Sequence, residues 1–356
     1  MAVTLQSYSN DQVFSCDIGD YTISGLTAST AYTITISKLF PSTSDILTLN
    51  LVSDASGEII LYNLQDVIEN HLQKLGVLKG QFCITVGEDD YTFMVYNSMF
   101  RRYRDVAEYV SRNFALSNRH YVVPRFGYFR LTLLSVTTLK FKATYLNLDS
   151  GETETSEHNL TTTPSSPNFN VSPSRISAIL ESSDIHHVLY SYSIYSGSHC
   201  VTIYVINEQS THRFLFLNNF FSWQCLNMIA GSKRSLDRQK SEAVCNGKKS
   251  YYDVRNSYQL DLEAFVPNYL SGEIDELIHS RDVRLIPDGT DLTGGVIDPD
   301  SCTKVLITSH TFDFNDEGTE AQTMNVKLMF ADPRDCQTEA LPADGIFHSE
   351  YDEIYS

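Results

Sequence analysis

The sequence lacks the features that mark several common classes of protein. No run of about 18 apolar residues occurs, which excludes a hydrophobic transmembrane helix. The first residues, MAVTLQSYSNDQVFSC, show neither the basic start nor the apolar core of a secretory signal peptide. We therefore expect synthesis in the cytoplasm, no export by a signal peptide and no membrane insertion.

Closely spaced cysteines are also missing. The seven cysteines are scattered, their number is odd and no CxxC pair occurs, which argues against a disulfide framework and against a zinc site. We expect free thiols in a reducing compartment. The cysteines are Cys16, Cys83, Cys200, Cys225, Cys245, Cys302 and Cys336.

Catalytic and cofactor motifs are absent as well. The sequence contains no GxSxG, HExxH, GxxxxGK[ST] or GxGxxG pattern. His186 and His187 are adjacent in an expected strand, so they point to opposite faces and cannot bind one metal ion together. The acidic stretches 298–302 and 313–318 lack the oxygen spacing of a calcium loop and are expected to be turns. We expect no catalytic residue, no metal and no cofactor, although a carboxylate pair formed only on folding stays open.

Positive charge is scarce, while aromatic residues are abundant. Lys and Arg number 26 against 44 Asp and Glu, and the net charge of −18 argues against a nucleic-acid partner. The 21 Tyr and 19 Phe, together with many Thr, Ser, Val and Ile, favour strands. We predict a mainly β protein with two or more antiparallel β-sandwich domains, fibronectin-like or immunoglobulin-like, and a few short helices.

Hydrophobic periodicity divides the chain into segments. Alternation over 1–52 predicts short strands, and QFCITVGEDDYTFMVYNS predicts a hairpin. Apolar residues at helical spacing predict helices after Asn63, over 103–116 and over 273–280. The polar stretch 149–174 marks the expected boundary. The predicted units are a β-rich N-terminal domain with two short helices at 1–150, a linker or exposed hairpin at 151–174, a β-rich C-terminal domain at 175–332 and an acidic tail at 333–356.

One short apolar stretch, FLFLNNFFSWQC at 214–225, includes Trp223, the only tryptophan. We expect a strand that is buried on both faces or covered by another subunit. The segment 231–255 follows with seven Lys and Arg against three acids, a local net charge of +4. It is either a solvated loop or a loop that faces a partner. The candidate subunit-contact residues are Phe220, Phe221, Trp223, Lys233, Arg234 and Arg238.

The order of these features resembles that of a known group of proteins. A strand ending in FLN is followed by an aromatic–Trp pair, a glycine with basic residues, Lys-x-Tyr, a Tyr-rich strand and ELIHSRDVRLIP. The first half contains DASGEIILYNLQDVIENHL and FMVYNSMFRRYRDVAEYVSRNFAL. Over roughly 1–330, this pattern is similar to uncharacterised tail or virion structural proteins of Bacteroidetes bacteriophages and prophages.

The resemblance implies a structural role and brings no catalytic residue with it. It implies a virion component of the tail or tail tip, made in the bacterial host cytoplasm, that self-associates in a ring or tube and contacts other virion proteins. Two alternatives stay open. A carbohydrate-binding or adhesin module would bind a host surface glycan through exposed aromatic residues, and a glycan-degrading enzyme is the less favoured alternative.

Overall fold

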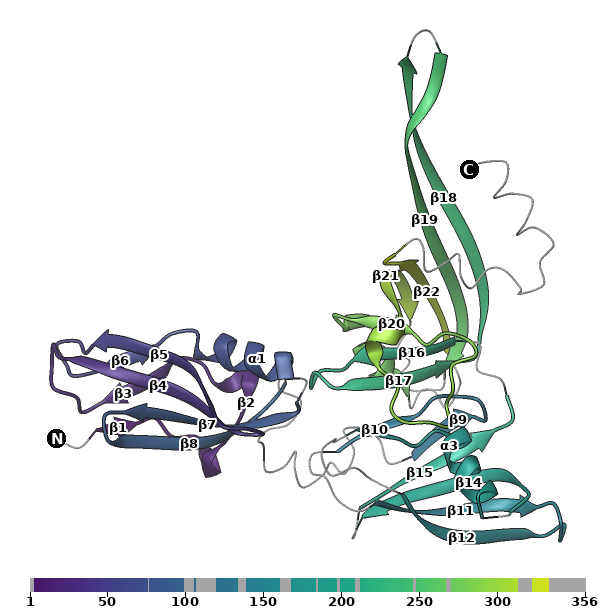
Figure 1. Ribbon diagram of the computed structural model, residues 1–356, viewed down its shortest axis with the longest axis horizontal. Coiled ribbons are helices and arrows are strands. Elements are labelled where there is room, and N and C mark those ends of the chain that lie inside the picture. The colour runs from purple at the N-terminus through teal and green to yellow at the C-terminus, as the bar shows by residue number, and fades with distance from the viewer. Residues whose placement is uncertain are drawn as a thin grey trace.

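Strands dominate the computed structural model, which confirms the predicted mainly β class (Figure 1). Most strand pairs are antiparallel, and short helices accompany them. No helix in the described part of the chain is long and apolar enough to cross a membrane. The structure describes residues 3–75, 77–98, 106, 120–133, 139–160, 168–183, 185–196, 199–208, 212–245, 248–266, 270–312 and 322–332.

The N-terminal unit, residues 3–98, is built from two sheets and one helix. A five-stranded sheet in the order β2-β8-β7-β4-β5 and a three-stranded sheet in the order β1-β3-β6 enclose a common core with α1. The elements are β1 (Thr4–Leu5), η1 (Ser9–Asp11), β2 (Gln12–Phe14), η2 (Ser15–Asp17), β3 (Tyr21–Ser24), β4 (Ala31–Phe40), β5 (Ser44–Val52), β6 (Ile59–Leu61), α1 (Leu64–Leu75), β7 (Lys79–Val86) and β8 (Asp89–Tyr96).

Local sequence signals explain this unit. Leu64, Ile68 and Leu72 lie four residues apart in α1, so they share one face, and all three are buried. The predicted hairpin is present as β7 and β8. The turn before β6 requires glycine, because Gly57 has a φ of +78° and a Cβ there would lie 2.3 Å from the carbonyl oxygen of Leu26.

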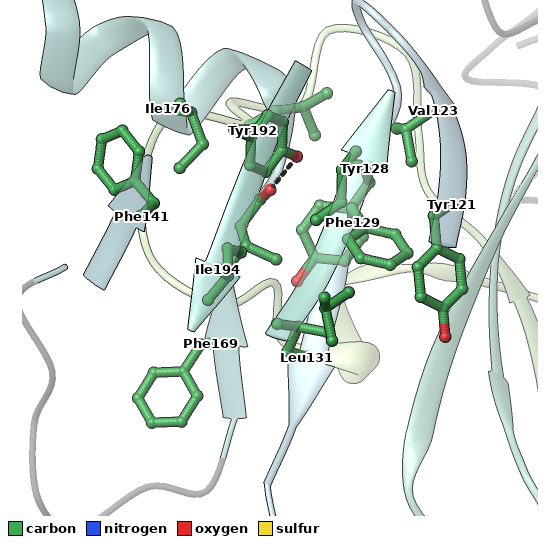
Figure 2. Packing of buried hydrophobic residues seen from close by; sticks show 14 of the residues in the cluster. Tyr121, Val123, Tyr128, Phe129, Leu131, Phe141, Phe169, Ile176, Tyr192 and Ile194 are labelled. Carbon is green, nitrogen blue, oxygen red and sulfur yellow. Dashed lines mark hydrogen bonds between the residues drawn. The ribbon is translucent and has the colours of Figure 1, made fainter. Parts of the chain in front are cut away.

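The middle layer combines strands from both sides of the polar stretch. Its five-stranded sheet has the order β12-β11-β14-β15-β9, and a second pair joins β10 to β13. Figure 2 shows aromatic rings filling its core, where the Tyr192 hydroxyl donates a hydrogen bond to the carbonyl oxygen of Val171. The elements are β9 (His120–Pro124), β10 (Arg130–Thr132), β11 (Leu139–Asn147), β12 (Thr153–Leu160), β13 (Asn168–Asn170), α3 (Pro173–Glu181), β14 (His187–Ser196) and β15 (His199–Ile206).

This pairing contradicts the predicted domain boundary at 150. β11 pairs with β12 on one side and with β14 on the other, so a single sheet continues across the polar stretch. The start of the stretch is the turn of the β11–β12 hairpin, which agrees with the hairpin alternative. Because β9 and β11 belong to this sheet, the N-terminal unit ends before residue 120. The polarity of β12 reflects an edge strand facing solvent and not a linker.

The C-terminal part is a seven-stranded sheet in the order β17-β16-β20-β21-β22-β19-β18. Only Ile229 separates β17 from β18, although these are the two outer strands. A flat sheet would hold them about 29 Å apart, whereas two residue steps span at most about 7 Å. The sheet therefore curls around its own core. Its elements are β16 (His212–Leu217), β17 (Trp223–Met228), β18 (Ala230–Cys245), β19 (Lys248–Val266), α4 (Ser271–His279), β20 (Val283–Leu285), η4 (Pro299–Ser301), β21 (Thr303–Phe312) and β22 (Gln322–Phe330).

The predicted helices have different outcomes. α1 and α4 confirm the helices expected after Asn63 and over 273–280. The helix expected over 103–116 lies outside the described residues, except for Val106, which is helical. α3 was not predicted, although Pro173 at its start and the buried Ile176 and Leu180 are ordinary helix signals. The middle core also includes residues of the curled sheet, such as Leu215 and Cys225, so β16 and β17 contribute to this core as well as to the separate core that the curled sheet encloses.

Candidate functional site

The apolar stretch 214–225 is a hairpin and not the single strand that we expected. β16 and β17 pair in register from His212 with Met228 to Leu217 with Trp223. The Oδ1 atom of Asn218 accepts hydrogen bonds from the backbone N–H groups of Phe220 and Ser222, each at 3.0 Å. The turn is completed by Phe221, whose φ is +53°. The Asn-Asn pair and Ser222 are the turn signals that the apolar character of the stretch obscured.

Phe220 does not reach the surface. It is 2% exposed and packs in a small cluster with Phe14, Leu78, Tyr96 and Val106. Three of these residues belong to the N-terminal unit, so the ring joins that unit to the curled sheet. The prediction that Phe220 contacts another subunit is therefore wrong, because its apolar surface is already buried within the chain.

Phe221 and Trp223 are half-buried beside arginine side chains. The guanidinium of Arg281 lies 5.7 Å from the centre of the Phe221 ring, and that of Arg284 lies 5.1 Å from the Trp223 ring. Arg284 also contacts Asp282 at 3.0 Å and Asp300 at 2.7 Å. Its hydrogen bond with Asp282 is the main reason why the pKa of Arg284 is raised. The two rings therefore lie in a charged cleft within one chain, and not in a dry apolar contact.

The basic segment after this hairpin is an ordered pair of strands and not a loop. β18 and β19 pair from Ala230 with Ala264 to Cys245 with Lys248. β19 also pairs with β22, but only from Gln259 to Val266. The remainder, residues 236–245 and 248–258, forms a two-stranded ribbon that we call the arm. Ten residues at about 3.4 Å each give the arm a length of roughly 34 Å, and Figure 1 shows it projecting from the sheet.

The three basic residues of the predicted site lie within β18. Lys233 and Arg234 are exposed at the base of the arm, and Arg238 lies within it. The side chain of Lys249, near the tip, is 3.8 Å from Glu242 across the pair. β18 and β17 are the two outer strands of the sheet. The structure thus separates the predicted site into two regions: Phe221 and Trp223 in the cleft, and Lys233, Arg234 and Arg238 on the arm strand.

The other polar candidates show no metal-binding geometry in the described part of the chain. No group of three or more His, Cys, Asp and Glu residues is arranged there to hold an ion. His186 is exposed and lies 3.3 Å from Asp149, whereas His187 is buried and its ring is inclined at 70° to that of Tyr145. Residues 298–302 contain the short helix η4, and 313–318 lie outside the described residues.

Comparisons with known proteins add little. No family model and no curated protein matches the chain. Among solved structures, 35% of this chain is similar to 95% of a chain from the virion of a native gene transfer agent particle, with 12% identity and a TM-score of 0.23. Likewise, 55% of this chain is similar to 79% of the calcium-binding domain CBD12 of CALX1.1, with 10% identity and a TM-score of 0.18. Similarities at these TM-scores carry no argument about fold or function.

Proposed function

We propose that this protein is a structural component of a bacteriophage virion, in the tail or tail tip, and that several copies assemble through the arm. The observation that carries the proposal is the arm itself, a long ribbon beyond the last strand that supports it. The resemblance of the sequence to virion proteins of Bacteroidetes phages supplies the biological setting.

A two-stranded ribbon in water is only marginally stable, because it has little core to offset the entropy lost on ordering. In the arm, the outer edge of each strand also carries backbone N–H and C=O groups that pair with no other strand of the described residues. Such edges are templates for pairing with another chain. Packing against a neighbouring copy provides the missing third strand or surface, and this explains why the sequence encodes so long a projection.

Charge favours the same partner. The segment 231–255, which includes most of the arm, has a net charge of +4 in a chain whose total is −18. The surface of a neighbouring copy is therefore acidic on average, and it attracts the arm. In a ring of identical subunits, the arm of one copy meets a different surface of the next. Each exposed pair contributes about 0–1 kcal/mol, so several act together and salt weakens them.

The test replaces residues 237–257 by a two-residue Asn-Gly turn that joins Leu236 to Tyr258, which are paired across the ribbon base. We expect an unchanged melting temperature, because the deleted residues lie outside the core of the curled sheet. In sedimentation measurements at low salt, we expect the oligomers to be lost. Incorporation into particles is expected to fall in parallel. The matched charge variant is Lys233→Glu with Arg234→Glu, and its control is Lys140→Glu on the exposed hairpin of the middle sheet.

The controls decide between assembly and folding. Raised salt is expected to mimic the double charge reversal, whereas the Lys140→Glu control assembles like the unmodified chain. Normal assembly of the armless chain at low salt would sink the proposal. A full-length chain that stays monomeric at all concentrations and enters no particle would count equally against it.

A further inference from the structure

A pocket of about 400 Å³ lies where the N-terminal unit, the middle layer and the curled sheet meet. Gln73 of α1 borders it on one side, Thr132 and Asn168 of the β10–β13 pair on a second, and the turn between β16 and β17 on a third. This volume is within the range of about 300–1,000 Å³ that is usual for small-molecule sites. Arg130 and Arg281 also line it.

Arg130 is the unusual member of this lining. Arg130 is only 8% exposed. Its Nε and Nη1 atoms are buried and have no hydrogen-bond partner in the described part of the chain. The ionisable groups that influence it are Tyr128 and Cys225. Burial raises the pKa of each to about 12, so both are neutral at physiological pH. Among the residues that the structure describes, this buried guanidinium has no counterion, which is costly unless an anion arrives.

The neighbouring acid does not supply that anion. Asp282 also lines the pocket, but its carboxylate lies 3.0 Å from Arg284 and 3.4 Å from Lys304. Burial alone would raise the pKa of Asp282, yet the hydrogen bond and charge of Arg284 bring the net shift below the usual value. The fold therefore provides counterions for Arg284 and leaves Arg130 for a group from outside.

We propose that this pocket binds an acidic monosaccharide unit, such as a uronic acid, whose carboxylate pairs with the guanidinium of Arg130. A guanidinium fork matches the two oxygens of a carboxylate. The side chains of Gln73, Thr132 and Ser222 can exchange hydrogen bonds with sugar hydroxyls, and Leu217 offers an apolar surface to the ring carbons. Beside its two arginines and the already paired Asp282, the pocket has several neutral polar groups and apolar walls, which fits an acidic sugar better than a bare inorganic anion. This inference does not depend on assembly through the arm.

The test titrates the full chain with glucuronate, galacturonate and their neutral parents glucose and galactose, followed by calorimetry and by ligand-observed NMR. At least one uronate is expected to bind, and its parent is expected to bind at least tenfold more weakly. Arg130→Met is expected to abolish uronate binding while keeping or raising the melting temperature, because it removes an unpaired buried cation. Arg130→Lys, which keeps the charge without the fork, is expected to weaken binding at least tenfold and covers the case in which the first variant fails to fold.

Three comparisons can overturn the proposal. Arg125→Met changes an exposed arginine outside the pocket and is expected to leave the affinity unchanged. Acetate that binds as tightly as the uronates would show a simple carboxylate site and would reject the sugar. A peptide of residues 336–356 that displaces a uronate would reassign the pocket to an acidic protein segment. Absence of uronate binding, or equal binding by Arg130→Met, would refute it directly.

Discussion

At the scale of single residues, His71 makes folding sensitive to acid. Its ring, on α1, meets the Phe82 ring edge-on at 6.5 Å, and its Nε2 atom is buried without a hydrogen-bond partner. Burial lowers the pKa of His71, and the nearby charges of Lys38 and Lys74 lower it further. The folded chain therefore favours neutral His71 more than the unfolded chain does.

The sign of the pH dependence follows from this shift. At a pH well above 6.5, the unperturbed pKa, His71 is neutral in both states and has no effect. As the pH falls through 6.5, the unfolded state binds the proton more readily, so the free energy of unfolding decreases. We expect His71→Leu to flatten this decrease in urea melts between about pH 7 and 5. Replacing the exposed His186 by Gln should leave it intact, and an unaltered slope in His71→Leu would exclude His71 as the source.

At the scale of elements, the turn between β16 and β17 depends on one side chain. Asn218 holds the N–H groups of Phe220 and Ser222, and all three residues are buried. Asn218→Ala leaves these donors without their partner, so we expect the free energy of unfolding to fall by about 1–3 kcal/mol. Asn50→Ala, which removes an exposed hydrogen bond to Thr33, is expected to change it by less than about 0.5 kcal/mol. Equal effects in chemical denaturation would show that the turn tolerates loss of the amide.

This turn also shows how far the sequence alone can lead. Regular periodicity predicted α1, α4 and the β7–β8 hairpin correctly, because each depends on neighbouring residues. The prediction of a single strand over 214–225 was wrong, because the turn in this stretch is buried between two units and therefore carries apolar side chains. The polar residues of β12 led to the wrong prediction of a domain boundary, because an edge strand of a sheet can have the composition of a linker. The burial of Arg130 could not be predicted from the sequence, because Cys225, one of the groups beside it, is distant in sequence.

At the scale of the whole molecule, two parts of the described chain are joined by a small contact. The N-terminal unit has one core, whereas the remainder has two, one in the middle layer and one enclosed by the curled sheet. Phe14, Leu78 and Tyr96 of the N-terminal unit meet Phe220 of the turn between β16 and β17 in the joining cluster. The arginine pocket lies at the same junction, so its walls depend on how firmly the two parts are held together.

Phe220 is therefore expected to control the coupling between the two parts more than the stability of either. Phe220→Ala removes a buried ring at a cost of about 3–5 kcal/mol, while the core of the N-terminal unit keeps all its residues. In calorimetry, we expect the variant to show two separated unfolding transitions, with the N-terminal one close to that of residues 1–98 measured alone. Phe126→Ala, at a residue 52% exposed, should behave like the unmodified chain. A single transition shifted as a whole would instead place the role of Phe220 inside the curled sheet, because loss of a local contact destabilises one cooperative unit without uncoupling two.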